Sequence, residues 1–146
     1  MNIPQAGILI RQIIGNINYY ISDKLKPHNI KHGQFEYFMI IKQDEGINQN
    51  QLAEIKGVGK ASVTKAVNVL ETQGYIMRKT GEDDKRNVSL YCTEKGNEIV
   101  GELTSYKLEL ESTVFKDFTD YERSELIRLL AKMRDNTKEL RGDNNG

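Results

Sequence analysis

The sequence is poor in the residues that brace small proteins covalently or through metals. Its 146 residues include one cysteine, two prolines, two histidines and no tryptophan. Cys92 has no partner for an intramolecular disulfide, which fits a reducing cytoplasm. A chain of this length buries roughly two-thirds of its unfolded surface and needs no such brace. We therefore predict a single cytoplasmic domain over residues 1–146, with neither a cofactor nor a metal.

Further absences argue against whole classes of function. No apolar run approaches the roughly 20 residues that cross a bilayer, so we expect no membrane span. The first residues, MNIPQAGILIRQ, have neither a basic leader nor a small-residue cleavage site, so we expect no signal peptide. The chain also lacks a nucleophile–His–acid set, a Gly-rich phosphate loop and paired carboxylates in an apolar setting. We therefore do not expect an enzyme.

Charge of one sign is not in excess either, because 21 Lys and Arg balance 21 Asp and Glu. A net charge of zero argues at first against a nucleic-acid partner. The balance shifts along the chain, however. Residues 48–95 carry eight basic and six acidic side chains, whereas residues 96–146 carry eight and eleven. The mildly basic middle is compatible with DNA binding and does not by itself demonstrate it.

Hydrophobic periodicity predicts a mainly helical chain with one β-hairpin. Apolar residues recur at helical spacing over residues 6–25, 34–43, 48–56 and 60–74, and again after Thr93 and Thr119. The period changes to two over residues 76–80 and 87–92, which predicts two strands. Asn48 with Gln51, and Thr119 with Glu122, have the spacing of capping boxes. The predicted fold class is therefore α+β, mainly α with a small hairpin.

The segment QLAEIKGVGKASVTKAV, residues 51–67, has the residues of a helix-turn-helix at the required offsets. Ala53 is small where the second helix would cross the first, and Gly57 tolerates the positive φ of the turn. Val58 follows as an apolar turn residue, and Val63 is a branched residue that faces the core. Each feature alone would also suit an ordinary helical hairpin. Their combination favours the helix-turn-helix.

The second helix of this motif has an apolar and a polar face. Val63, Val67 and Leu70, with Ala66 beside them, point inward. The outward residues are Lys60, Ala61, Ser62, Thr64, Lys65 and Asn68. Amide, ammonium and hydroxyl groups pair with base edges or phosphates, and an alanine methyl contacts a thymine methyl. A merely solvated face is the alternative; the absence of an acid from residue 60 to 70 favours DNA.

The stretch GEDDKRNVSLYCTEKG, residues 81–96, would by itself be a charged, solvated hairpin turn. With the preceding helix-turn-helix, however, the chain resembles the MarR family of transcriptional regulators, named for multiple antibiotic resistance. The resemblance rests on NQNQLAEIKGVGKASVTKAVNVLETQGYIMRK, followed by DDKRNVSLYCTEKG. The family's wing signature is Asp-x-Arg, a strand and Leu-Thr-x-x-Gly. It matches Asp84 to Arg86 and Thr93 to Gly96, with Cys92 in place of the leucine.

The resemblance implies a homodimer that binds double-stranded DNA at a pseudo-palindromic operator. Residues 30–93 would form the winged helix-turn-helix head, and residues 1–29 and 94–146 would form interlaced dimerisation helices. The terminal helices are consistent with this arrangement, because their apolar faces exceed what a small central unit covers. Such faces pack together within a chain or across a two-fold axis.

The resemblance also implies how each head would contact DNA. Recognition helices would enter successive major grooves roughly 34–36 Å apart. Each wing would lie along a flanking minor groove, where a narrow groove attracts an inserted arginine. By position this arginine is Arg86, with Lys85 beside it, and Asp84 would orient Arg86 or brace the wing.

Family members commonly release DNA when a small aromatic, often phenolic, anion binds between the dimer helices and the head, so we expect a repressor that such a ligand releases. An aromatic carboxylate needs a cation or a donor cluster together with a wall of rings. The candidate effector residues are Arg11, Gln12, Asn16, His32, Tyr37 and Tyr106. For each of them taken singly, a place in the core or on its rim is the alternative.

Two other sensing mechanisms have weaker support in the sequence. His28 and His32 are four residues apart, but no cysteine or acidic cluster completes a metal site around them. Cys92 alternates with Val88 and Leu90 on an inward strand face, where a thiol packs rather than reacts.

Two other classes of function are alternatives to a DNA-binding regulator. A winged-helix protein-interaction module without DNA binding would carry acids or exposed apolar residues on the outward face of residues 60–70. A small-ligand carrier would enclose a cavity among its terminal helices and would not need Arg86. DNA binding that weakens steeply with rising salt separates the regulator from both.

Overall fold

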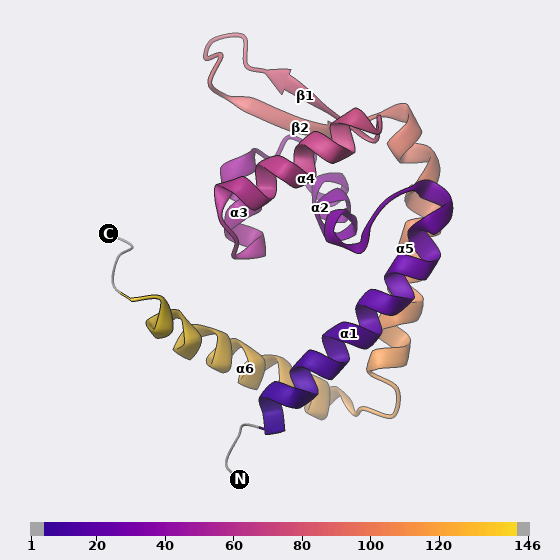
Figure 1. The fold of residues 1–146 in the computed structure, drawn as a ribbon, viewed down its shortest axis with the longest axis vertical. Helices are drawn as coiled ribbons and strands as arrows, with labels where there is room; N and C mark the ends of the chain where they lie inside the picture. Colours follow the sequence, from indigo (N-terminus) through magenta and orange to yellow (C-terminus); the bar gives the residue numbers. More distant parts are fainter. Residues whose placement is uncertain (1–4, 143–146) are drawn as a thin grey trace. The chain divides into compact units, whose positions relative to one another are not determined.

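The computed structural model describes residues 5–142, which form α-helices, two short 3-10 helices and one two-stranded hairpin (Figure 1). The elements are α1 (Gln5–Leu25), η1 (Lys26–His28), α2 (His32–Gln43), α3 (Gln49–Lys56), α4 (Lys60–Thr72), β1 (Ile76–Thr80), β2 (Val88–Cys92), α5 (Glu94–Val114), α6 (Asp120–Thr137) and η2 (Lys138–Arg141). The chain divides into two units, residues 1–107 and 108–146, so α5 begins in the first and ends in the second. The predicted class, mainly α with a small hairpin, is confirmed.

A reciprocal side-chain cap fixes the start of α3. The Asn48 side chain accepts a hydrogen bond from the N–H of Gln51 at 2.8 Å, and the Gln51 side chain accepts one from the N–H of Asn48 at 3.0 Å. A cap of this kind typically contributes about 1 kcal/mol. Gly57 then ends α3 at φ 65°, a conformation that glycine adopts without strain. Helix, turn and helix therefore follow one another as predicted for residues 51–67.

Two predicted helix ends are wrong by two residues. α2 begins at His32 rather than at Gln34, because the Gln34 side chain accepts a hydrogen bond from the N–H of Lys31 at 2.9 Å. This bond extends the helix by capping it from its own first turn. α4 ends at Thr72 rather than at Gly74, and Gly74 turns the chain into the hairpin at φ 84°.

The hairpin pairs β1 and β2 antiparallel, so that Ile76 lies opposite Cys92. The second strand begins at Val88 rather than at the predicted Asn87. Asn87 belongs to the turn instead, where its carbonyl oxygen accepts a hydrogen bond from the N–H of Gly81 at 2.7 Å. The hairpin therefore ends in a closed turn that presents the charged residues between these two positions.

The core of the first unit lies where α4 packs against α2, α3 and β1. The largest fully buried side chains are Phe38, Leu25, Ile41, Leu52, Leu70, Ile76, Leu90, Leu103, Val63 and Val67. They include all three aliphatic residues predicted to point inward from α4. The rings of Phe38 and Tyr75 meet edge to face with centroids 6.1 Å apart, a favourable aromatic geometry. Met39 on α2 is half-buried.

The hairpin joins α5 through a close backbone approach. The Thr93 hydroxyl donates to the carbonyl of Gly74 and accepts from the N–H of Gly96 at 3.1 Å, so Thr93 caps α5 as predicted. A Cβ on Gly96 would lie 2.3 Å from the carbonyl oxygen of Tyr75, which leaves room for glycine alone. The junction therefore explains the Thr-x-x-Gly pattern: Thr93 caps the helix, and Gly96 leaves space for the Tyr75 carbonyl.

Both terminal helices expose apolar side chains. On α1, within the first unit, Ile13 and Ile14 are 49% and 51% exposed. In the second unit none of the residues of α6, all of which the structure describes, is buried. Its exposed apolar side chains include Ile127, Leu129, Leu130 and Met133. Exposed apolar patches of this kind mark interaction surfaces. Within residues 5–142 no helix has the length and apolar character to cross a membrane.

Candidate nucleic-acid interface

The outward face of α4 is accessible along its whole length. All six of its predicted DNA-contacting residues are exposed: Lys60, Ala61, Ser62, Thr64, Lys65 and Asn68. The opposite face anchors the helix, since Val63 and Val67 are 0% exposed. Gly59 precedes the helix without a side-chain cap, as its lack of a side chain requires. α4 therefore presents short polar and basic side chains from a rigidly packed element.

Two of these outward residues are held by neighbouring elements. The Thr64 hydroxyl donates to Oε1 of Gln49 on α3 at 3.1 Å. The amide oxygen of Asn68 accepts from Nη2 of Arg78 on β1. Arg78 also lies 3.3 Å from Glu71 on α4, measured from Nε to Oε2. Because its oxygen is engaged in this way, Asn68 presents its amide N–H groups as donors.

Sequence reasoning missed Arg78 as a residue of this interface. The signal was present in the strand alternation, which puts Arg78 on the same face as the buried Ile76. A charged residue at an inward strand position needs a partner, and here Asn68 and Glu71 supply it. Arg78 thereby joins the hairpin to the exposed face of α4.

Asp84 holds Arg86 at the turn of the hairpin. Oδ1 of Asp84 accepts hydrogen bonds from the backbone N–H of Arg86 at 3.0 Å and from its Nε at 3.2 Å. The Arg86 side chain nevertheless stays 93% exposed, so its remaining N–H donors face solvent. Asp84 therefore orients Arg86 and braces the turn, the two roles that the sequence left open. Lys85 between them is also exposed.

The effector candidates on the first two helices have different surroundings. Arg11, Gln12 and Asn16 are exposed on α1. His32, at the start of α2, shares a 3.0 Å hydrogen bond with the hydroxyl of Ser22 on α1. These four residues all have polar atoms within reach of solvent.

The two tyrosine candidates belong to separate clusters of the first unit. Tyr37 is only 5% exposed, and the Lys56 ammonium of α3 lies 4.9 Å from the centre of its ring. The Tyr106 hydroxyl donates to Glu102, and the Lys24 ammonium of α1 lies 5.8 Å from the centre of its ring. These contacts place Tyr37 between α2 and α3 and Tyr106 between α1 and α5, so they do not bring the two rings into one group.

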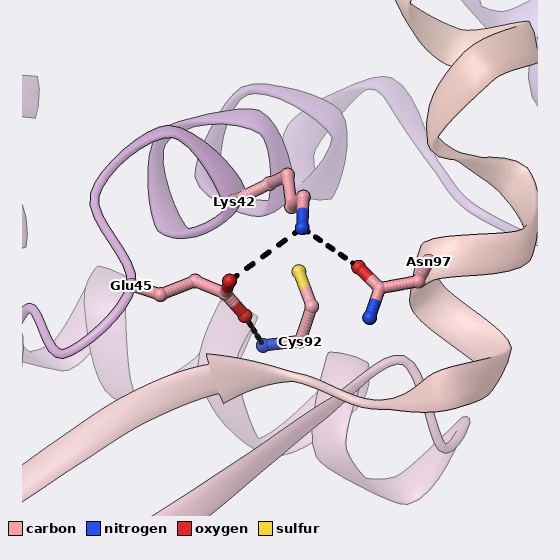
Figure 2. A network of polar contacts seen from close by, with 4 residues as sticks. All are labelled: Lys42, Glu45, Cys92 and Asn97. Carbon is pink, nitrogen blue, oxygen red and sulfur yellow. Dashed lines mark hydrogen bonds and ion pairs between the residues drawn. The ribbon is translucent and has the colours of Figure 1, made fainter.

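Cys92 lies in a polar network that ties α2, β2 and α5 together (Figure 2). The Lys42 ammonium donates to Oδ1 of Asn97 at 2.8 Å and lies 3.5 Å from Oε2 of Glu45. Oε1 of Glu45 accepts from the backbone N–H of Cys92 at 2.8 Å. Burial and then the Glu45 charge raise the pKa of the Cys92 thiol to about 11, although Lys42 acts in the opposite direction. The thiol is therefore protonated and unreactive at neutral pH.

The two histidines have separate partners. Nε2 of His28 lies 3.0 Å from Oε2 of Glu102, whereas His32 contacts Ser22. Among residues 5–142 no three His, Cys, Asp or Glu side chains form a group that could hold a metal ion.

Comparison with known proteins places this arrangement in a family. The MarR family model matches residues 30–88, which extend from just before α2 to the start of β2. A MarR protein from Peptoclostridium difficile is 30% identical in sequence, and the alignment covers 92% of this chain and 86% of that one, with a TM-score of 0.77. This chain belongs to the MarR family.

Other relatives agree with this assignment. A MarR-family regulator from Listeria monocytogenes, solved in complex with 26mer DNA, is 25% identical, with coverage of 97% and 95% and a TM-score of 0.78. The HTH-type transcriptional regulator BilQ of Clostridioides difficile is 28% identical over 120 residues, which cover 82% of this chain and 81% of BilQ. The family and these relatives are transcriptional regulators rather than enzymes, and the fold is the winged helix of the MarR family.

Proposed function

We propose that this MarR-family protein is a homodimeric repressor that binds double-stranded DNA sequence-specifically and is released by a small aromatic ligand. The observation that carries the proposal is the exposed face of α4, which has no acid from residue 60 to 70, beside a hairpin that presents Arg86 to solvent. The Listeria monocytogenes relative in complex with DNA supports it. α4 would read base edges in the major groove, and the hairpin would serve as the wing in the adjacent minor groove.

The base-reading role falls to the exposed side chains of α4. Lys65 and Asn68 offer donors to base acceptors, and Ala61 offers a methyl to thymine. Lys60, Ser62 and Thr64 reach phosphates or bases from the start of the same helix. In the wing, Arg86 enters the minor groove, Lys85 adds charge beside it, and Asp84 sets the direction of the guanidinium.

The head comprises residues 30–93, and residues 1–29 and 94–146 form the dimerisation region. The exposed apolar side chains of α1 and α6 support this division, because a second copy of the chain would remove them from water. Two heads related by a two-fold axis would read a pseudo-palindrome with half-sites roughly 34–36 Å apart.

The dimer has a direct test in solution. Sedimentation equilibrium on the full chain should give twice the monomer mass of 16.7 kDa. Leu130→Glu places a charge on the exposed apolar side of α6 and should shift the mass toward the monomer. Lys132→Glu changes the charge of the same helix at an already polar, exposed position and should leave the dimer intact. A wild-type protein that stays monomeric at micromolar concentration contradicts the dimer.

The effector would be an aromatic carboxylate or a phenol. Lys24 supports a site near the junction of α1 and α5, because its ammonium lies 5.7 Å from the centre of the Tyr20 ring and 5.8 Å from that of Tyr106. A cation beside two rings suits an aromatic anion. The residues proposed to bind it are Arg11, Gln12, Asn16, His32, Tyr37 and Tyr106. Among them, Tyr106 would supply the ring at this junction, whereas Tyr37 is buried beside Lys56 in a separate cluster.

Selection of bound duplexes from a random pool tests the sequence-specific part of the function. The expected product is an inverted repeat that the protein binds more tightly than shuffled duplexes of the same composition. Phenolic and benzoic acids are then screened for release of the selected duplex. No enrichment after repeated rounds contradicts sequence-specific binding, whereas enrichment without release by any aromatic acid contradicts only the effector.

A further inference from the structure

A polar hollow lies where the start of α3 meets the hairpin. Its volume is about 310 Å³, and it is lined by Asn48, Gln49, Asn50, Arg78, Arg86, Asn87 and Val88. We call this hollow the notch. Its lining carries two guanidinium groups, four side-chain amides and no carboxylate. Guanidinium and amide N–H groups are the donors that proteins use to hold an oxyanion.

The two arginines reach the notch from different parts of the hairpin, Arg78 from the middle of β1 and Arg86 from the turn, and each has N–H donors that make no hydrogen bond. Arg78 Nε lies 3.3 Å from Oε2 of Glu71 without a hydrogen bond between them, so this buried donor has no hydrogen-bond acceptor among the described residues. Leaving a buried donor unsatisfied is unfavourable. Arg86 is held by Asp84 through one nitrogen of its side chain and is otherwise exposed. Neither acid lines the notch itself.

We propose that the notch binds one backbone phosphate of the operator DNA, with Arg78 as its ligand and the positive charge of Arg86 at its edge. This inference rests on the proposed DNA binding. The notch adjoins both elements that would enter adjacent grooves, since its lining residue Arg78 contacts Asn68 on α4 and its lining residue Arg86 belongs to the turn of the wing. A sugar–phosphate strand separates a major groove from the neighbouring minor groove. This strand therefore passes between α4 and the wing, where the notch offers its donors.

The notch would also position the base-reading side chain. Phosphate contacts fix the register of a protein on DNA without reading its sequence. Arg78 donates a hydrogen bond to the Asn68 oxygen and also lines the notch. A phosphate bound in the notch would therefore be linked through Arg78 to Asn68, which would contact a base. Arg78 is accordingly a positioning residue for Asn68 and a phosphate ligand in its own right.

Asn50→Asp tests the notch with little structural disturbance. Asn50 is exposed in the first turn of α3, where an acid is favourable to the helix, so the variant should fold as stably as the wild type. The new carboxylate repels a phosphate. We expect the variant to bind the selected duplex about tenfold more weakly. The slope of log K against log salt should be shallower by about 0.9 for each notch that no longer binds a phosphate. Gln43→Glu makes the same change of charge at the exposed end of α2 and should bind as the wild type does.

Asn50→Lys provides the opposite change and should tighten binding, which a merely structural role of Asn50 does not predict. Equal affinity and salt slope for Asn50→Asp and Gln43→Glu would overturn the notch while leaving DNA binding intact. A wild type that does not bind DNA is a different result and overturns the proposed function itself.

A free phosphate ion carries the same oxyanion as a DNA phosphate, so its binding to the notch is tested separately. Inorganic phosphate is titrated against chloride at constant ionic strength while the amide resonances of residues 48–50 are followed by NMR. A site for DNA phosphate should show only weak, unsaturated shifts at millimolar phosphate. Saturation at micromolar phosphate, together with unchanged DNA affinity of Asn50→Asp, would assign the notch to a free anion and overturn the proposal.

Discussion

Arg78 on β1 donates a hydrogen bond to the amide oxygen of Asn68 on α4, so the hairpin holds an exposed side chain of the proposed recognition helix. An unrestrained asparagine pairs bidentately with adenine, using its oxygen as acceptor and its N–H as donor. With the oxygen engaged, Asn68 presents donors. We therefore expect it to contact an acceptor on a base, such as guanine O6 or thymine O4.

Asn68→Ala should relax base preference at one position in each half-site. We expect the ratio of affinities for selected and shuffled duplexes to fall by about tenfold, within the range of one lost base contact. Binding to shuffled DNA should change little, because no charge is removed. Competition binding with single-base variants of the selected duplex measures the effect. Thr72→Ala, at the exposed last residue of α4, is the matched control. If Asn68→Ala leaves the affinities for all single-base variants in the wild-type order and ratio, Asn68 makes no base contact.

Arg86→Ala should weaken binding to all duplexes alike. Loss of one phosphate or minor-groove contact in each head should lower the salt slope by about 0.9 per head. Arg86→Lys keeps the charge and should restore the slope, but it loses the guanidinium geometry that Asp84 sets. Lys116→Ala removes an exposed cation from the connection between α5 and α6 and serves as the control. An Arg86→Ala protein with wild-type affinity and slope rules out the wing contact.

Gly96→Ala should destabilise the fold at the join between the hairpin and α5. The new Cβ would lie 2.3 Å from the Tyr75 carbonyl oxygen, and such overpacking costs roughly 1–3 kcal/mol. Gly101→Ala lies on the same helix with nothing within 4 Å of the new Cβ, so it should be neutral or stabilising by about 0.5–1 kcal/mol. Thermal unfolding of both variants should give shifts of opposite sign; equal midpoints would show that the approach to Tyr75 relaxes freely.

Cys92 should resist alkylation in the folded protein. Its pKa of about 11, against a reference of 9.0, means about a hundredfold less thiolate at neutral pH, and its burial slows the reagent further. The raised pKa also favours the fold below pH 9, and this contribution is lost as pH rises toward 11. Iodoacetamide labelling with and without denaturant measures the first effect. Equal labelling rates would mean that the network with Glu45 does not protect the thiol.

The sequence predicts those features whose causes are local. Asn48 with Gln51 marks the start of α3 by its spacing alone, and the inward placement of Val63 follows from helical period. The start of α2 was missed because Lys31 is not a residue type that caps helices, so the Gln34 bond gives no sequence signal although it has the spacing of a capping box. The role of Gly96 could not be predicted from the sequence, because Tyr75, whose carbonyl it approaches, precedes the hairpin whereas Gly96 follows it.

The candidate site was predictable where one element carries it and not where two elements meet. The outward face of α4 could be predicted from its own periodicity. The contact of Arg78 with Asn68, and the notch that Arg78 shares with Arg86, depend on how the hairpin packs on α3 and α4. The effector candidates could not be sorted from the sequence either, because Tyr37 and Tyr106 belong to clusters formed by different pairs of helices.

An equilibrium salt titration tests whether α4 and the wing bind DNA. The affinity of the wild-type protein for the selected duplex and for a shuffled duplex is measured by fluorescence anisotropy between about 50 and 200 mM salt. With six Lys and Arg between residues 60 and 86 of each chain, we predict a steep linear fall of log K with log salt for both duplexes. The selected duplex should stay the tighter ligand throughout. A flat salt dependence, or equal affinity for the two duplexes, would contradict the account.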